Sequence, residues 1–259
     1  MKSLLVLATV KEKQVTSPLL MLILDSCLNY AMGSYSPVTH VIFDLDGLIL
    51  DTEKVYKLKY EELLARYNKQ FTHEMRLAVL GRKDVDCAEE IIRATNIPLT
   101  PVEFSAEIKK LQTGAMKSAE LKPGAERLVQ HLARSKVPIA VATSSSRETY
   151  ELKVSNRHEL MAQFHHVVMA GSDQEVKKGK PHPDIYLVCA SRFPDNPHPS
   201  KCLVLEDAHN GVQGAIAAGM QVVMVPEDFL PRELTKEATL VLNSLEEFQP
   251  EVFGLPKFS

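Results

Sequence analysis

From residue 38 onward, short apolar runs rich in β-branched residues alternate with longer stretches in which apolar residues recur at helical spacing. The short runs predict strands at residues 39–43, 138–142, 166–170, 202–205 and 221–225, with a sixth candidate at 239–242. Helices are predicted between them, for example over 124–135, 183–192 and 210–218. Strands that alternate with helices are typical of a parallel sheet covered by helices, so the pattern predicts an α/β fold.

One interval breaks this alternation. Residues 53 to about 120 contain no convincing strand, and their amphipathic pattern predicts helices over about 53–67, 73–80, 84–95 and 101–119. A helical block inserted after the first strand of an α/β sheet predicts a cap over the ends of the strands. We therefore expect a Rossmann-like parallel sheet core, formed by residues 37–52 and 121–259, with an inserted helical cap domain at 53–120.

The N-terminal region has two apolar runs, at residues 4–10 and 18–24, that are too short to span a bilayer. Charged residues at 11–13 separate them, and no arginine supports a mitochondrial presequence. We expect residues 1–36 to form a poorly ordered extension without a membrane role. Met32 lies just before the first strongly patterned segment, so residues 1–31 are expected to be dispensable.

The composition is that of an ordinary soluble protein, with 45% hydrophobic and 24% charged residues among 259. A formal net charge of −3 provides no basic field for a nucleic-acid polymer, so any phosphate recognition must be local. The four cysteines are scattered and show no CxxC spacing, which favours reduced thiols over disulfides or a zinc site. We expect a monomeric cytoplasmic protein that acts on a small molecule.

Polar residues occur where four of the predicted strands end or soon after, and ligands of parallel sheets bind at that edge. They are Asp44 and Asp46 with the first strand, Thr143 and Ser144 with the second, Lys180 beyond the third, and Glu206 and Asp207 with the fourth. We expect these side chains to form one site.

Asp44 and Asp46 are two residues apart at a strand end, so both carboxylates can face one pocket. Asp44 would attack a phosphorus atom. Asp46 would protonate the leaving oxygen and then activate water against the aspartyl-phosphate. The alternative is an Asp-Gly turn with a capping aspartate.

Glu206 and Asp207 offer hard oxygen ligands of the kind that Mg²⁺ prefers. Together with Asp44 they would place at least three carboxylates in a small region, where a divalent cation would relieve their repulsion. The alternative is a helix N-terminus that carries acidic residues.

Phosphate contacts are expected from Lys180, which lies between a glycine and a proline, and from Thr143 and Ser144. Their alternatives are a surface lysine and simple N-capping. Arg82 and Lys83 follow a glycine between two cap helices, where they would reach a phosphate or a nucleoside. A solvated loop explains that pair as well.

The order of these motifs resembles that of the haloacid dehalogenase superfamily, with FDLDG at 43–47, VATS at 141–144, GKP at 179–181 and LEDAHNG at 205–211. The resemblance implies that Asp44 is the nucleophile, and that Asp46 is the acid/base with its backbone carbonyl on Mg²⁺. It also implies that Thr143 and Lys180 hold the phosphoryl group. Asp207 would be a metal ligand, and Glu206 a direct or water-mediated one.

A helical cap after the first motif resembles the subclass that contains β-phosphoglucomutase and small-metabolite phosphatases. Within it, four segments are similar to those of pseudouridine-5′-phosphatases, and most of this likeness lies in the C-terminal third. They are DGLILDTE, KCLVLEDAHNGV, AAGMQVVMVP and ATLVLNSLEEFQPEVFGLP. The resemblance implies a magnesium-dependent phosphomonoesterase for pseudouridine 5′-phosphate. The alternatives are another sugar-phosphate or nucleotide phosphatase, a phosphomutase that returns the phosphoryl group to a sugar, and a catalytically silent binding protein.

Overall fold

The computed structural model describes residues 35–80, 82 and 84–258. The expectations for residues 1–34, including the start at Met32, lie outside these described residues, and so does the one for Lys83. None of the described helices is both long and apolar enough to cross a membrane.

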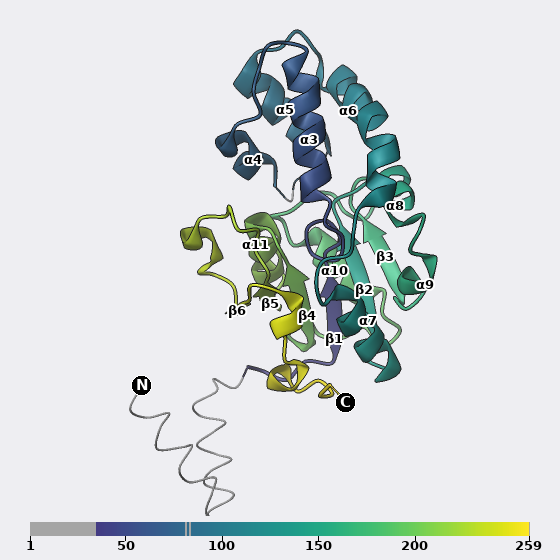
Figure 1. Ribbon diagram of the computed structural model, residues 1–259. Helices are drawn as coiled ribbons and strands as arrows, with labels where there is room; N and C mark the ends of the chain where they lie inside the picture. Colours follow the sequence, from purple (N-terminus) through teal and green to yellow (C-terminus); the bar gives the residue numbers. More distant parts are fainter. Residues whose placement is uncertain (1–34, 81, 83, 259) are drawn as a thin grey trace, which may run out of the picture.

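The described residues form a parallel sheet whose strands occur in the order β3-β2-β1-β4-β5-β6 (Figure 1). The strands are β1 (His40–Phe43), β2 (Ile139–Thr143), β3 (His166–Met169), β4 (Cys202–Glu206), β5 (Gln221–Met224) and β6 (Leu240–Val241). This confirms the predicted α/β fold, including the sixth strand. The chain runs outward in both directions from β1, and ligands of such doubly wound sheets bind beside the strand where the order reverses.

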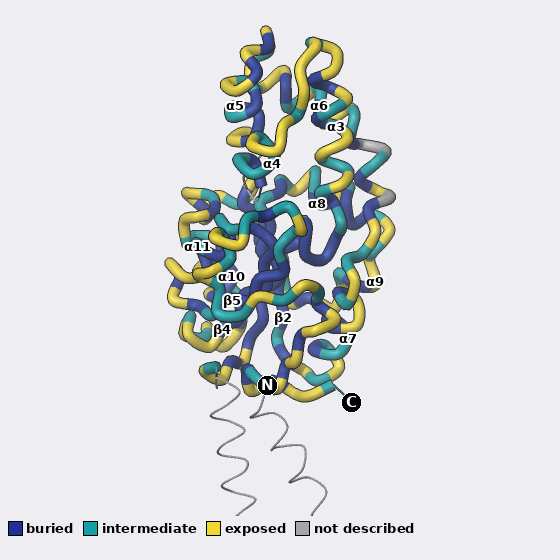
Figure 2. Tube along the Cα trace, turned by 60° about the vertical axis from the view of Figure 1, so that its left-hand side comes forward, coloured by how far each residue is buried: buried dark blue, intermediate teal, exposed yellow. Residues whose placement is uncertain are grey.

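Helices cover both faces of the sheet because successive strand residues point to opposite sides. Val41 and Phe43 of β1 face one core cluster, and Ile42 faces the other. Figure 2 shows the buried stretches of the chain gathered around the strands in the middle of the sheet. The first face packs against α7 (Ala125–Arg134), α8 (Arg147–Val154) and α9 (His158–Met161), and the second against α10 (Asp184–Ser191) and α11 (His209–Ala217). The sequence did not predict α8 and α9.

Four further helices lie together beyond the carboxyl ends of the strands (Figure 1). They are α3 (Glu53–Ala65), α4 (His73–Val79), α5 (Asp84–Thr95) and α6 (Pro101–Ala115). They share a buried cluster that includes Leu63, Ile91 and Phe104, separate from the two clusters of the sheet. We propose that they form the expected cap domain.

Candidate active site

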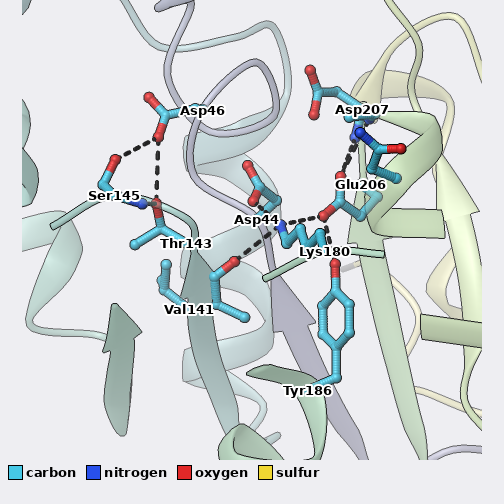
Figure 3. A network of polar contacts seen from close by, with 12 residues as sticks. Asp44, Asp46, Val141, Thr143, Ser145, Lys180, Tyr186, Glu206 and Asp207 are labelled. Carbon is cyan, nitrogen blue, oxygen red and sulfur yellow. Dashed lines mark hydrogen bonds and ion pairs between the residues drawn. The ribbon is translucent and has the colours of Figure 1, made fainter. Parts of the chain in front are cut away.

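Lys180 lies between two carboxylates where β1 and β4 end, beside the reversal of strand order (Figure 3). Its ammonium contacts Asp44 Oδ1 and lies 2.5 Å from Glu206 Oε1. The Lys180 side chain is 1% exposed, so this lysine is not the solvated surface residue that the sequence left open. The Asp44 backbone N–H donates to the Leu205 carbonyl at 3.0 Å, which holds the aspartate against β4.

The Glu206 carboxylate accepts hydrogen bonds through both of its oxygens. Oε1 accepts from Tyr186 Oη at 2.6 Å as well as from Lys180, and Oε2 accepts from the backbone N–H groups of Asp207 and Ala208 at 3.1 and 3.2 Å. These contacts engage both carboxylate oxygens, so Glu206 orients Lys180.

Asp207 is in the opposite situation. Its Oδ2 is buried and has no hydrogen-bond partner among the described residues. Asp44, Glu206 and Asp207 each offer an oxygen within 4.8 Å of the others. Gly47, at φ +84°, keeps this space open, because a Cβ there would lie 2.0 Å from Asp207 Oδ2. A buried carboxylate oxygen without a partner is costly, so this set of residues fits a small divalent cation.

The acidic cluster is electrostatically strained. Burial raises the pKa of Asp44 to about 7, against the opposing effect of Lys180. Burial, followed by the charges of Glu206 and Asp44, raises the pKa of Asp207 well above its ordinary value. The same two carboxylates raise the pKa of Lys180 although burial alone would lower it, so the lysine stays charged. A bound cation would favour the ionised carboxylates.

Asp46 is held by a separate set of contacts. Its Oδ1 accepts from Thr52 Oγ1 at 2.8 Å and lies 2.6 Å from Lys153 Nζ, while its Oδ2 accepts from Ser145 Oγ at 3.1 Å and Thr143 Oγ1 at 3.3 Å. Burial alone would raise the pKa of Asp46, but Lys153 and these hydrogen bonds lower it overall. Asp46 is therefore ionised before it meets a substrate.

A cavity lies between this edge of the sheet and the four-helix block. It is lined by Asp44 and Asp46, by Ser144 and Arg82, and by residues that the sequence did not single out. The latter include Glu53, Tyr56, Lys57, Tyr60, Phe71 and Arg76. The structure thus brings the described candidate residues to one region, although the Thr143 hydroxyl contacts Asp46 and Arg82 is exposed.

Lys153 and Glu53 are among the charged residues of the site that the sequence analysis did not identify. Lys153 is in the last turn of α8, after Ser146, whose Oγ accepts from the Thr149 N–H at 3.3 Å as an N-cap. The serine cap is the one local signal that could have marked the start of this helix. Burial raises the pKa of Glu53 to about 7, with Glu227 adding to the effect.

Comparison with known proteins identifies relatives over most of the chain. Residues 41–225 match the model of the haloacid dehalogenase-like hydrolases. A Drosophila melanogaster protein named "Probable pseudouridine-5′-phosphatase" is 46% identical over 222 residues, which are 86% of this chain and 96% of that protein. "(DL)-glycerol-3-phosphatase 1, mitochondrial" of Arabidopsis thaliana is 43% identical over 224 residues, 85% of this chain and 75% of that protein.

Among solved structures, β-phosphoglucomutase from Clostridium difficile superposes with a TM-score of 0.70 at 23% identity, covering 83% of this chain and 94% of that one. This likeness concerns the fold alone.

Proposed function

This chain belongs to the haloacid dehalogenase-like hydrolase family, and we propose that it hydrolyses pseudouridine 5′-phosphate to pseudouridine and phosphate. It is a phosphoric monoester hydrolase, as the relatives with named phosphatase activities indicate. The observation that carries the choice of substrate is the 46% identity to the Drosophila protein over almost its entire length.

The aromatic side chains that line the cavity favour a substrate that contains a ring. Tyr56, Tyr60 and Phe71 line the same cavity as Asp44, and the Tyr60 and Phe71 ring centroids are 4.9 Å apart. Aromatic walls bury a planar base favourably, and glycerol 3-phosphate has no ring to pack against them. Glycerol 3-phosphate is nevertheless a second candidate, because the Arabidopsis protein of 43% identity carries that activity in its name.

In the proposed reaction a carboxylate oxygen of Asp44 attacks phosphorus, and the bond from phosphorus to the ester oxygen breaks. Asp46 delivers a proton to that leaving oxygen. It then takes a proton from the water that attacks the aspartyl-phosphate, so that phosphate leaves and Asp44 is regenerated. Because Asp46 is ionised at rest, it must take up a proton as the substrate enters.

Two further groups would hold the phosphoryl oxygens. Lys180 already contacts Asp44, and its buried charge would stabilise the charge that develops on those oxygens. Ser144 lines the cavity beside Asp44 and would add hydrogen bonds. Thr143, whose hydroxyl donates to Asp46, would help to hold the phosphoryl group from beside that carboxylate.

We propose Mg²⁺ as the cation. Asp44, Asp207 and the backbone carbonyl of Asp46 would hold it directly, and Glu206 would act on it through water or through Lys180. When bound, Mg²⁺ would polarise the phosphoryl oxygens and screen the carboxylates from one another. The cytoplasmic location and the monomeric state stay predictions.

The test is a panel of phosphate monoesters scored for inorganic phosphate, with Mg²⁺ and with EDTA. Pseudouridine 5′-phosphate should give the highest kcat/KM, at least roughly tenfold above uridine 5′-phosphate. A higher value for glycerol 3-phosphate would favour the second candidate. Conversion of β-glucose 1-phosphate to glucose 6-phosphate without phosphate release would instead identify a phosphomutase. Full activity in EDTA would exclude the proposed cation.

A further inference from the structure

Lys153 carries an ammonium group that lies wholly inside the protein, with its side chain 0% exposed. Nζ lies 2.6 Å from Asp46 Oδ1 and donates to Ser145 Oγ at 2.8 Å and to Tyr56 Oη at 2.7 Å. An ammonium has three N–H donors, so these contacts use all of them. Lys153 therefore has no donor left for a substrate phosphate, and its role lies in the groups that it holds.

Those groups come from three separate segments. Asp46 follows β1, Ser145 follows β2, and Tyr56 is in the first turn of α3 in the cap, 97 residues from Lys153 along the chain. Separating a buried charge from its partner costs much free energy. The Lys153 ammonium therefore favours an arrangement in which the three segments stay in contact with it.

The two oxygens of Asp46 are held from different sides. Among the described residues, Oδ2 accepts from Thr143 and Ser145, at and just after the end of β2 (Figure 3). Oδ1 accepts from Thr52, the N-cap residue of α3, and contacts Lys153, which itself is bonded to Tyr56 of the same helix. The direction in which the Asp46 carboxylate points is therefore linked to the position of α3.

We propose that Lys153 is a positioning residue that aims the Asp46 carboxylate for proton transfer and, through the Tyr56 hydroxyl, makes this aim depend on how α3 is seated over the cavity. The inference rests on the acid/base role proposed for Asp46. Proton transfer requires heavy atoms within about 2.6–3.2 Å, so a small rotation of the carboxylate would interrupt it. Lys180 does not replace Lys153, because its ammonium contacts Asp44, Glu206 and the Ala142 carbonyl instead.

The leaving group distinguishes this role from a purely structural one. An alkyl alcohol needs a proton as it leaves, whereas p-nitrophenolate leaves readily without one. A misaimed Asp46 should therefore slow the cleavage of alkyl phosphates much more than that of p-nitrophenyl phosphate.

The experiment compares Lys153→Met with the wild type in single turnovers with excess enzyme and Mg²⁺, following release of the alcohol or of p-nitrophenol. We expect the first-turnover rate on the alkyl ester to fall by about 100-fold and that on p-nitrophenyl phosphate by less than about tenfold. Lys153→Arg, which keeps the cation, should recover part of the alkyl rate. Equal losses on both esters, or no loss on either, would overturn the proposal.

Tyr56→Phe keeps the ion pair and removes the hydroxyl that accepts from Lys153, so it tests the second half of the proposal and still serves if Lys153→Met does not fold. We expect a selective loss on the alkyl ester of about three- to tenfold; an unchanged ratio of the two rates would refute the link. The alkyl ester is whichever one the wild type hydrolyses best. A wild type without activity on pseudouridine 5′-phosphate thus refutes the proposed substrate alone, while the ratio of rates judges Lys153.

Discussion

Replacing Lys180 with methionine tests the electrostatic arrangement of the whole site. Methionine keeps most of the length of the side chain but removes the charge between Asp44 and Glu206, whose side chains are 7% and 0% exposed. Breaking a buried ion pair costs about 3–5 kcal/mol of unfolding free energy. At about 2–4 °C per kcal/mol, the melting temperature should fall by roughly 6–20 °C.

Two conditions should reduce this loss. Mg²⁺ should raise the melting temperature of Lys180→Met more than that of the wild type, because a cation bound only by the native state stabilises it and the variant has greater need of positive charge. The loss should also be smaller at pH 5 than at pH 8. Burial already raises the pKa values of Asp44 and Asp207, so at low pH these carboxyls take up protons and the uncompensated charge disappears.

Differential scanning fluorimetry at both pH values, with and without Mg²⁺, measures these effects. Lys110→Met is a matched control, since its ion pair with Glu107 joins side chains that are 72% and 33% exposed, and exposed pairs contribute little. The reasoning would be refuted if the two variants melted within about 2 °C of each other in EDTA at pH 8.

Four further outcomes are expected. Asp44→Asn keeps the shape of the side chain but cannot form the aspartyl-phosphate, so phosphate release should vanish while the circular dichroism spectrum is unchanged; residual turnover would exclude Asp44 as nucleophile. Gly47→Ala would add a Cβ 2.0 Å from Asp207 Oδ2 at φ +84°, so the activity should be lost and Mg²⁺ should no longer raise the melting temperature; a normal Mg²⁺ response would contradict this. Glu53→Gln should stabilise the protein at pH 8, by up to about 3 kcal/mol, but hardly at pH 5. The reason is that burial raises the pKa of Glu53 from 4.5 to about 7, the native state holds the extra proton in that window, and stability falls as the pH rises through it; equal effects at both pH values would count against this. Arg82→Ala should raise KM for the nucleotide but not for p-nitrophenyl phosphate, and equal changes would assign Arg82 to the phosphate site or to the seating of the cap.

The strands and the motif residues that follow them could be predicted because both depend on local sequence. A strand buried on both faces needs a continuous apolar run, and residues 202–205 form one that ends at Glu206 and Asp207. The helical spacing of α3 and α6 was equally visible, and the Thr100 capping box fixes the start of α6. The interval between β2 and β3 was harder, because α8 has 8 residues and α9 only 4, too few turns to establish a period.

The roles within the site depended on contacts between distant residues. The sequence left Glu206 as a direct or water-mediated ligand. In the structure its carboxylate accepts from Tyr186, Lys180 and two backbone N–H groups, and only the fold brings Tyr186 close to it. Asp207 was predicted as a metal ligand, and its Oδ2 has no hydrogen-bond partner within the described part of the chain. Neighbouring carboxylates thus received different environments, because adjacent residues at a strand end point in different directions.

The sequence by itself determined that this chain forms a parallel α/β sheet with a helical insertion, and that acidic residues, a lysine and hydroxyl groups collect at one edge of the sheet. Only the tertiary structure decided which charge faces which. Lys180 joins Asp44 from 136 residues away, and Lys153 reaches Asp46 from a helix that the sequence did not reveal. The periodicity of apolar residues in a short segment predicts which of its side chains are buried. Ion pairs between distant segments depend on where folding brings those segments together, and local periodicity does not predict this.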